Sequence, residues 1–186
     1  MGTSAEPVRN ALRKLWSDHV IWTRQYIVAA VAGTADADAA AGRLLRNQED
    51  IGAAVVPYYG EAGGAGLTGL LKHHIMIAVD LVAAAKSGDG QAFATHDERW
   101  TSNIREIAAF LAGANSNWPE SAVFDLLALH LKLTKDETVA RIKGDWAGDV
   151  QAFDDIFNEI LVVADTLFDG LVAQFPERFG VTPAHA

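Results

Sequence analysis

Apolar residues recur every three or four positions along almost the whole chain, the spacing that places them on one face of a helix. Alternating runs of β-branched residues, the mark of a strand, are nearly absent. We therefore predict an all-α, single-domain bundle of about six helices over residues 1–175, followed by a loose C-terminal tail over residues 176–186. Thr134 and Glu137 fit a capping box, which predicts a helix start there. The other predicted breaks lie at Gly33, at a glycine-rich loop within residues 57–66, at residues 87–90 and at residues 115–119.

A threefold repeat is visible in the positions of a few polar residues. A leucine is followed four residues later by a histidine at three places separated by 55 and 56 residues, His19, His74 and His130. Three further polar residues are separated from one another by 56 positions, namely Asn47, Asn103 and Glu159. The simplest interpretation divides the bundle into three helical hairpins, each with a histidine on its first helix and an amide or carboxylate on its second.

Several polar residues share a helical face with apolar ones. His74, for example, falls in the stripe formed by Leu67, Leu70 and Leu71. The polar residues on or beside such stripes are His19, His74, His130, Asn47, Asn103, Asp149 and Glu159. A buried polar group without a partner costs roughly 1–3 kcal/mol. We therefore expect these side chains to meet one another or a shared guest inside the bundle.

Imidazole and carboxylate groups are common ligands of Zn²⁺, Fe²⁺ and Mn²⁺, and helical bundles build metal sites from inward-facing residues. The leading hypothesis is a divalent transition metal bound by three histidines and one carboxylate. The predicted ligands are His19, His74 and His130 with Glu159 or, second in order, Asp149. Asn47 and Asn103 would hold the imidazole tautomers. Alternatively, the carboxylates would accept directly from the imidazoles, with Arg24, just off the face of His19, as counter-charge. No reaction follows from this set of residues, so whether the protein is an enzyme stays open.

Two other interpretations of the same residues stay open. The first is a buried hydrogen-bond network that fixes how the helices align. The second is a pocket for an organic small molecule. The chain has neither a Glu-x-x-His nor a His-x-x-x-His pair, which weakens comparison with ferritin-like di-iron proteins and haemerythrins.

Net charge and cysteine content limit the kinds of partner and metal site that we expect for this chain. The formal net charge is −9 without a basic tract, which disfavours nucleic acid and anionic membranes, and the absence of cysteine excludes thiolate metal sites and disulfides. No secretory signal opens the sequence, and its longest apolar tracts are too short to span a bilayer. We expect a cytoplasmic protein whose partner is a metal ion, a small molecule or, as a homodimer, a second copy of the chain.

The segment Leu15-Trp-Ser-Asp-His-Val-Ile-Trp-Thr-Arg24 resembles the N-terminal segment of a family of short, all-helical bacterial proteins. The resemblance continues through residues 43–47, 57–60, 130–134 and 159–165 and the helix around His74. It implies a functional role for the positions that belong to the family pattern, namely His19, Arg24, Asn47, His74, His130 and Glu159. It implies no particular reaction.

Overall fold

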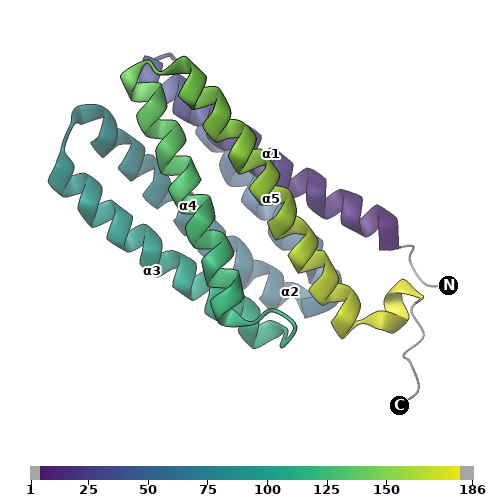
Figure 1. Ribbon diagram of the computed structural model, residues 1–186. Coiled ribbons are helices and arrows are strands. Elements are labelled where there is room, and N and C mark those ends of the chain that lie inside the picture. The colour runs from purple at the N-terminus through teal and green to yellow at the C-terminus, as the bar shows by residue number, and fades with distance from the viewer. Residues whose placement is uncertain (1–4, 181–186) are drawn as a thin grey trace.

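The chain forms five α-helices and one short 3₁₀ helix in the computed structural model, which describes residues 5–180 (Figure 1). Their bounds are α1 Ala5–Ala32, α2 Ala37–Ser87, α3 Gly90–Ala114, α4 Glu120–Lys143, α5 Trp146–Gln174 and η1 Pro176–Phe179. No strand is present among these residues, and the all-α prediction is confirmed.

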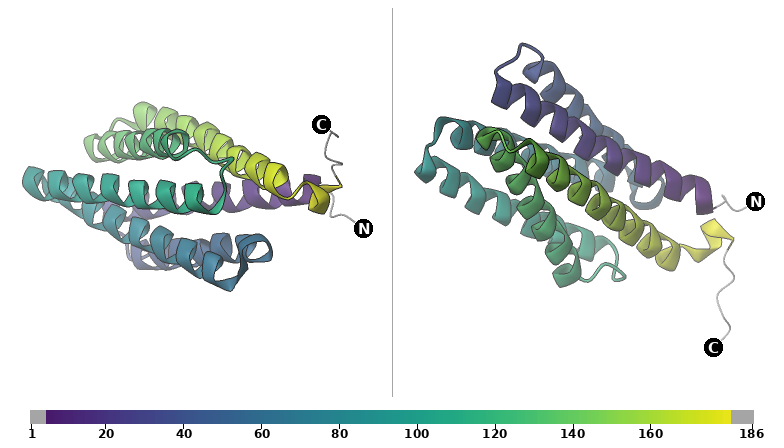
Figure 2. Two further views of the ribbon diagram at one scale, coloured as in Figure 1. Left: turned by 90° about the horizontal axis from the view of Figure 1, so that it is seen from below. Right: turned by 45° about the horizontal axis from the view of Figure 1, so that its top comes forward.

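The helices surround a common core in chain order. Each of α1 to α5 packs against the next along the chain, and α1 packs against α5, so that the ring is closed. Helix α1 begins and α5 ends at the same end of the bundle (Figure 2). Because the ring closes, residues from distant parts of the sequence can face one interior point.

Helix α2 doubles back on itself at Gly60. This residue has φ 73° and ψ 175°, outside the helical region and favourable only for glycine. A Cβ atom added to Gly52 would lie 2.7 Å from the Gly64 carbonyl oxygen. Residues twelve apart in a straight helix would be about 18 Å apart. Helix α2 therefore consists of a first arm, residues 37–59, and a second arm, residues 61–87, which touch where both lack a side chain.

Two predicted helix boundaries are wrong. The residues 57–66 are helical on both sides of Gly60 rather than a loop, because the reversal takes place within a single residue. Thr134 lies inside α4, and Glu137 is buried rather than completing a cap. The helix ends instead at Gly144, which caps the C-terminus of α4 with φ 71°. The count is thus five helices rather than about six, and the predicted threefold repeat stays a prediction.

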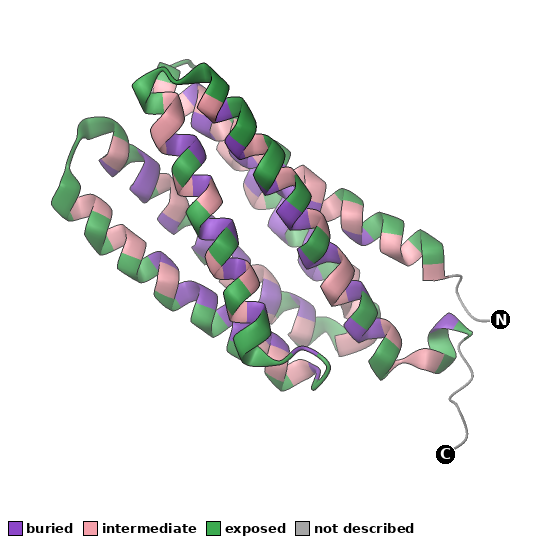
Figure 3. Ribbon diagram, viewed as in Figure 1, coloured by how far each residue is buried: buried purple, intermediate pink, exposed green. Residues whose placement is uncertain are grey.

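The core lies on the inward faces of all five helices, where buried positions recur at helical spacing (Figure 3). Its most completely buried large side chains include Trp100, Ile104 and Ile160. The predicted tail begins as ordered structure, since Pro176–Phe179 form η1 and Phe179 is buried. The remainder of that tail, residues 181–186, lies outside the described residues.

Helix α2 is long and apolar enough to cross a membrane by length and composition. Within its most apolar window of 18 residues, 44% are buried inside the bundle. The core helix of a water-soluble protein passes the same test, so this finding is weak support for a membrane span.

Candidate functional site

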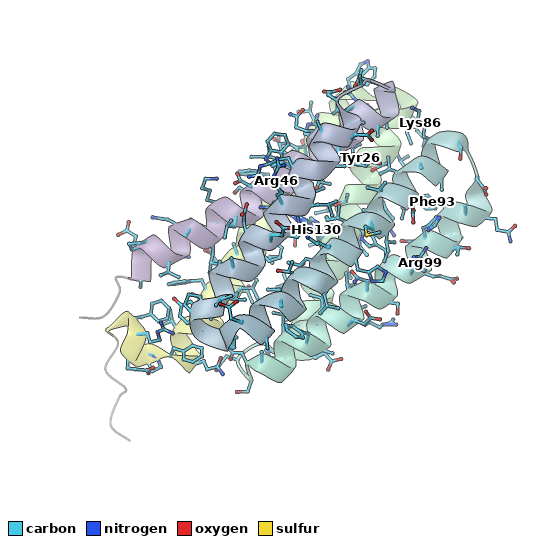
Figure 4. All side chains as sticks on the ribbon, turned by 180° about the vertical axis from the view of Figure 1, so that it is seen from behind. Tyr26, Arg46, Lys86, Phe93, Arg99 and His130 are labelled. Atoms are coloured by element: carbon cyan, nitrogen blue, oxygen red, sulfur yellow. The ribbon has the colours of Figure 1, made fainter. Side chains whose placement is uncertain are left out.

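Three histidine side chains meet in the interior of the bundle. His19 comes from α1, His74 from the second arm of α2 and His130 from α4, and their exposed fractions are 3%, 4% and 3%. The centroid of the His19 ring lies 5.6 Å from that of His130 and 6.5 Å from that of His74, and the His74 and His130 centroids are 6.5 Å apart. Figure 4 shows His130 among the helices of the bundle. We name these three side chains the histidine cluster.

Each ring of the histidine cluster is hydrogen-bonded through Nδ1 to a residue 29 positions later in the sequence. The pairs are His19 with Gln48 Nε2 at 3.2 Å, His74 with Asn103 Oδ1 at 2.8 Å, and His130 with Glu159 Oε2 at 3.0 Å. In each pair the partner lies on the helix or arm that follows in the chain. No hydrogen bond reaches Nε2 of these rings from residues 5–180. Nδ1 is therefore committed to the scaffold, and Nε2 is the nitrogen left for a guest.

Burial keeps two of these imidazoles in the neutral form that binds metals. Desolvation lowers the pKa of His74 to about 3, and a charge on the neighbouring His130 would lower it further. Desolvation also lowers the pKa of His19 well below its ordinary value, again assisted by the other two rings. Both side chains are thus unprotonated at neutral pH and offer a lone pair.

The three rings line one cavity of about 20 Å³. A cavity of roughly 10–15 Å³ on this scale holds one water molecule. Trp100 lines the same cavity, its ring centroid lies 5.0 Å from that of His74, and its indole N–H is buried without a hydrogen-bond partner. The space therefore fits a single ion or water, and it is too small for an organic molecule of ordinary size.

The structure does not bring the two predicted carboxylate ligands to this cavity. Glu159 accepts a hydrogen bond from His130 Nδ1, and its second oxygen, Oε1, is buried without a partner. Asp149 is held by Arg24 and Arg141 and does not line the cavity. In this arrangement Glu159 orients an imidazole, and neither carboxylate lines the cavity. Their role as metal ligands stays a prediction.

Arg24 and Asp149 belong to a separate buried ion network. The Arg24 guanidinium donates to Asp149 Oδ1 at 2.9 Å and Oδ2 at 3.0 Å, and to Glu137 Oε1 at 2.5 Å. Arg141 donates to Asp149 Oδ2 at 3.2 Å. Burial raises the pKa of Glu137 to about 7, although Arg24 acts in the opposite direction. Arg24, expected as counter-charge just off the face of His19, pairs with the carboxylates of Asp149 and Glu137.

Of the two asparagines predicted to hold imidazole tautomers, one contacts its histidine directly and the other does not. Asn103 contacts His74 directly, and its Nδ2 donates to the Leu70 carbonyl oxygen at 3.2 Å. Asn47 donates to the Leu15 carbonyl oxygen at 3.0 Å but reaches His19 only through Gln48. Gln48 was not predicted from the sequence, although the separation of 29 from His19, shared by the other two pairs, identifies it.

The separations between the three ring centroids can be compared with those around a bound zinc ion. Zinc binds imidazole nitrogen at about 2.0–2.1 Å, which would place three ring centroids roughly 5.3 Å apart around a tetrahedral ion. The observed separations of 5.6–6.5 Å are roughly 0.3–1.2 Å wider than that. Accordingly, no group of three His, Asp or Glu side chains within residues 5–180 is placed to hold a metal without adjustment.

Comparisons with known protein families, with curated proteins and with solved structures find no match to this chain. The resemblance to a bacterial family therefore stays a prediction. The arguments about function rest on the geometry of the histidine cluster.

Proposed function

We propose that the protein binds one divalent transition metal ion through Nε2 of His19, His74 and His130. One observation carries the proposal: three buried imidazoles from three separate helices share a cavity of about 20 Å³, while a scaffold residue occupies Nδ1 of each ring. At His74 and His130 this partner is an oxygen that can accept from Nδ1, as is characteristic of metal-binding histidines, and it fixes the ring orientation. A contraction of roughly 1 Å in ring separation would complete the site.

The cavity favours an ion over the organic ligand considered from the sequence. Its volume corresponds to about one water molecule, and small-molecule sites are usually at least roughly 300 Å³. The lining also narrows the choice among Zn²⁺, Fe²⁺ and Mn²⁺. No carboxylate lines the cavity. Imidazole suits zinc and iron, whereas manganese prefers oxygen ligands. We therefore favour Zn²⁺ or Fe²⁺ over Mn²⁺.

Three protein ligands would leave one coordination position open. An ion bound in this way supplies Lewis-acid chemistry and lowers the pKa of a bound water. The chain's own contribution is to hold three imidazoles on separate helices, keep His19 and His74 neutral by burial and exclude bulk water. The Trp100 side chain lines the same cavity.

Metal content of purified protein after equilibrium dialysis against Zn²⁺ or Fe²⁺ tests the proposal. We expect one ion per chain in the wild type and none retained in His74→Ala. The adjacent His73 is exposed and provides a matched control, since His73→Ala removes the same group without touching the cavity. This control is expected to retain one ion.

Circular dichroism separates loss of the site from loss of the fold. A His74→Ala protein that stays helical and loses its ion supports the proposal. A wild type that retains no ion, together with a His74→Ala variant that is strongly destabilised, would overturn it in favour of a purely structural hydrogen-bond network.

A further inference from the structure

The three histidine pairs are alike in position but differ in the group that faces Nδ1. At His74 this group is an amide oxygen and at His130 a carboxylate oxygen, whereas at His19 it is an amide nitrogen. An oxygen of this kind accepts a hydrogen bond and an amide nitrogen donates one. The three rings therefore cannot all carry their proton on the same nitrogen.

The amide orientation at His74 is fixed by a second hydrogen bond. Asn103 Nδ2 donates to the Leu70 carbonyl oxygen at 3.2 Å, so Asn103 Oδ1 is the atom that faces the ring. His74 Nδ1 must then carry the proton. The carboxylate of Glu159 imposes the same arrangement on His130 in its neutral form. In both rings Nε2 offers a lone pair.

The orientation at His19 is fixed in the opposite sense. Gln48 Nε2 lies 2.8 Å from the Leu44 carbonyl oxygen and 3.1 Å from Asn47 Oδ1, and both of these atoms are acceptors. Asn47 cannot turn to offer its nitrogen without losing its bond to the Leu15 carbonyl oxygen. The nitrogen of Gln48 therefore faces His19 Nδ1 at 3.2 Å. The two hydrogens of this amide are shared among His19 Nδ1 and the two oxygens. A hydrogen on His19 Nδ1 would point at these amide hydrogens, so His19 keeps its lone pair at Nδ1 and carries its proton on Nε2.

The cavity is thus lined by one imidazole N–H, from His19, and two imidazole lone pairs, from His74 and His130. The threonines of the lining add no free donor, because the hydroxyls of Thr23, Thr134 and Thr138 all donate to backbone carbonyls of their own helices. One donor and two acceptors around room for one water are within the hydrogen-bonding capacity of a single water molecule.

We infer that the metal-free protein binds one buried water, which accepts from His19 and donates to His74 and His130, and that Gln48 holds His19 in the tautomer this water requires. The inference concerns the metal-free protein and stands without the proposed function. Joined to that function, it makes Gln48 a positioning residue, because His19 must move its proton to Nδ1 before Nε2 can bind a metal. The proton moves within one ring, so the charge is unchanged.

Long-range ¹H–¹⁵N correlation spectra of the histidine rings test this directly, because they distinguish the two neutral tautomers. In the metal-free wild type we expect the Nε2–H form at His19 and the Nδ1–H form at His74 and His130. After addition of Zn²⁺ we expect a change at His19 alone. Nδ1–H at all three rings in the metal-free protein would overturn the inference. Absence of Zn²⁺ binding would overturn the proposed function and leave the metal-free result unaffected.

Gln48→Glu provides a second test. A carboxylate at this position accepts rather than donates, so we expect His19 to adopt the Nδ1–H form in the metal-free variant and Zn²⁺ affinity to rise by about tenfold. Gln25 lies on the exposed side of α1, and Gln25→Glu adds the same charge without changing His19. An unchanged His19 tautomer in a folded Gln48→Glu protein would contradict the role of Gln48. If that variant does not fold, the wild-type spectra decide the inference.

Discussion

At the scale of single residues, the interior of this bundle contains two separate sets of polar side chains with different chemistry. The histidine cluster consists of imidazoles without a carboxylate in its cavity, whereas Arg24, Glu137, Asp149 and Arg141 form an ion network that balances its own charge. Burial acts on the two groups in opposite directions. It lowers the pKa of His74 and raises that of Glu137, because in each case the charged form is disfavoured.

The first prediction concerns acid sensitivity of the metal-free protein. The pKa of His74 is about 3 when folded and about 6.5 when unfolded, so between these values only the unfolded chain binds the proton. The free energy of unfolding should fall as the pH is lowered from 6.5 towards 3, by up to about 1.4 kcal/mol per pH unit for this residue. Urea titrations at several pH values measure the slope. His74→Phe should make it shallower, and His73→Phe should not. Equal slopes in both variants would contradict the assignment.

Glu137 gives a prediction of opposite sign. Its pKa is raised from 4.5 to about 7, so the folded protein holds a proton that the unfolded chain releases. Between these pH values the contribution of Glu137 to stability declines as the pH rises. Glu137→Gln should remove this decline, while the exposed Glu106→Gln should leave it in place. The same urea titrations, extended to pH 8, decide the question.

At the scale of elements, the reversal inside α2 depends on two glycines that allow close approach. A Cβ atom at Gly52 would lie 1.9 Å from the Thr68 hydroxyl oxygen and 2.7 Å from the Gly64 carbonyl oxygen. A backbone oxygen cannot move aside as a side chain can. The two arms of α2 would therefore have to move apart. This movement would also separate His74, on the second arm, from Gln48, on the first arm.

The third prediction follows from this contact. Gly52→Ala should lower the free energy of unfolding by about 1–3 kcal/mol, the usual cost of overpacking. Gly69 lies on the same helix with nothing within 4 Å of an added Cβ, so Gly69→Ala should raise stability by roughly 0.5–1 kcal/mol. Urea denaturation midpoints of both variants measure the difference. A neutral Gly52→Ala would show that the arms are not in tight contact.

The sequence predicted the helical class and the inward phase of the histidines because both depend on local periodicity, as at His74 among its leucines. It predicted a break at the turn that ends at Gly60, but it extended this break into a glycine-rich loop, whereas the reversal takes place at Gly60 alone and its flanks stay helical. Asp149 shares an apolar stripe with the core, but it pairs with Arg141 on the preceding helix and with Arg24, 125 residues away in the sequence. Such pairings depend on which helices are neighbours, and periodicity does not contain that information.

At the scale of the whole molecule, the packing of the closed ring of helices brings the three histidines together from separate helices. Because α1, α2 and α4 each supply one histidine, an ion bound by all three would tie together residues 19–130 of the chain. An ion that binds only the folded state stabilises it by mass action.

The fourth prediction follows from this linkage. At a free Zn²⁺ concentration one hundred times the Kd, the wild type should gain about 2.7 kcal/mol in the free energy of unfolding. His74→Ala should gain nothing, and His73→Ala should behave as the wild type. Thermal or urea unfolding with and without Zn²⁺ measures these gains. Equal gains in all three proteins would place the ion at the surface.

Anomalous diffraction at the zinc absorption edge, from crystals grown with Zn²⁺, tests the metal centre most directly. We predict one strong peak inside the bundle, about 2.0–2.1 Å from Nε2 of His19, His74 and His130. A map with zinc only at exposed carboxylates or at His73 and His96, and with no peak between the three rings, would contradict the proposed function.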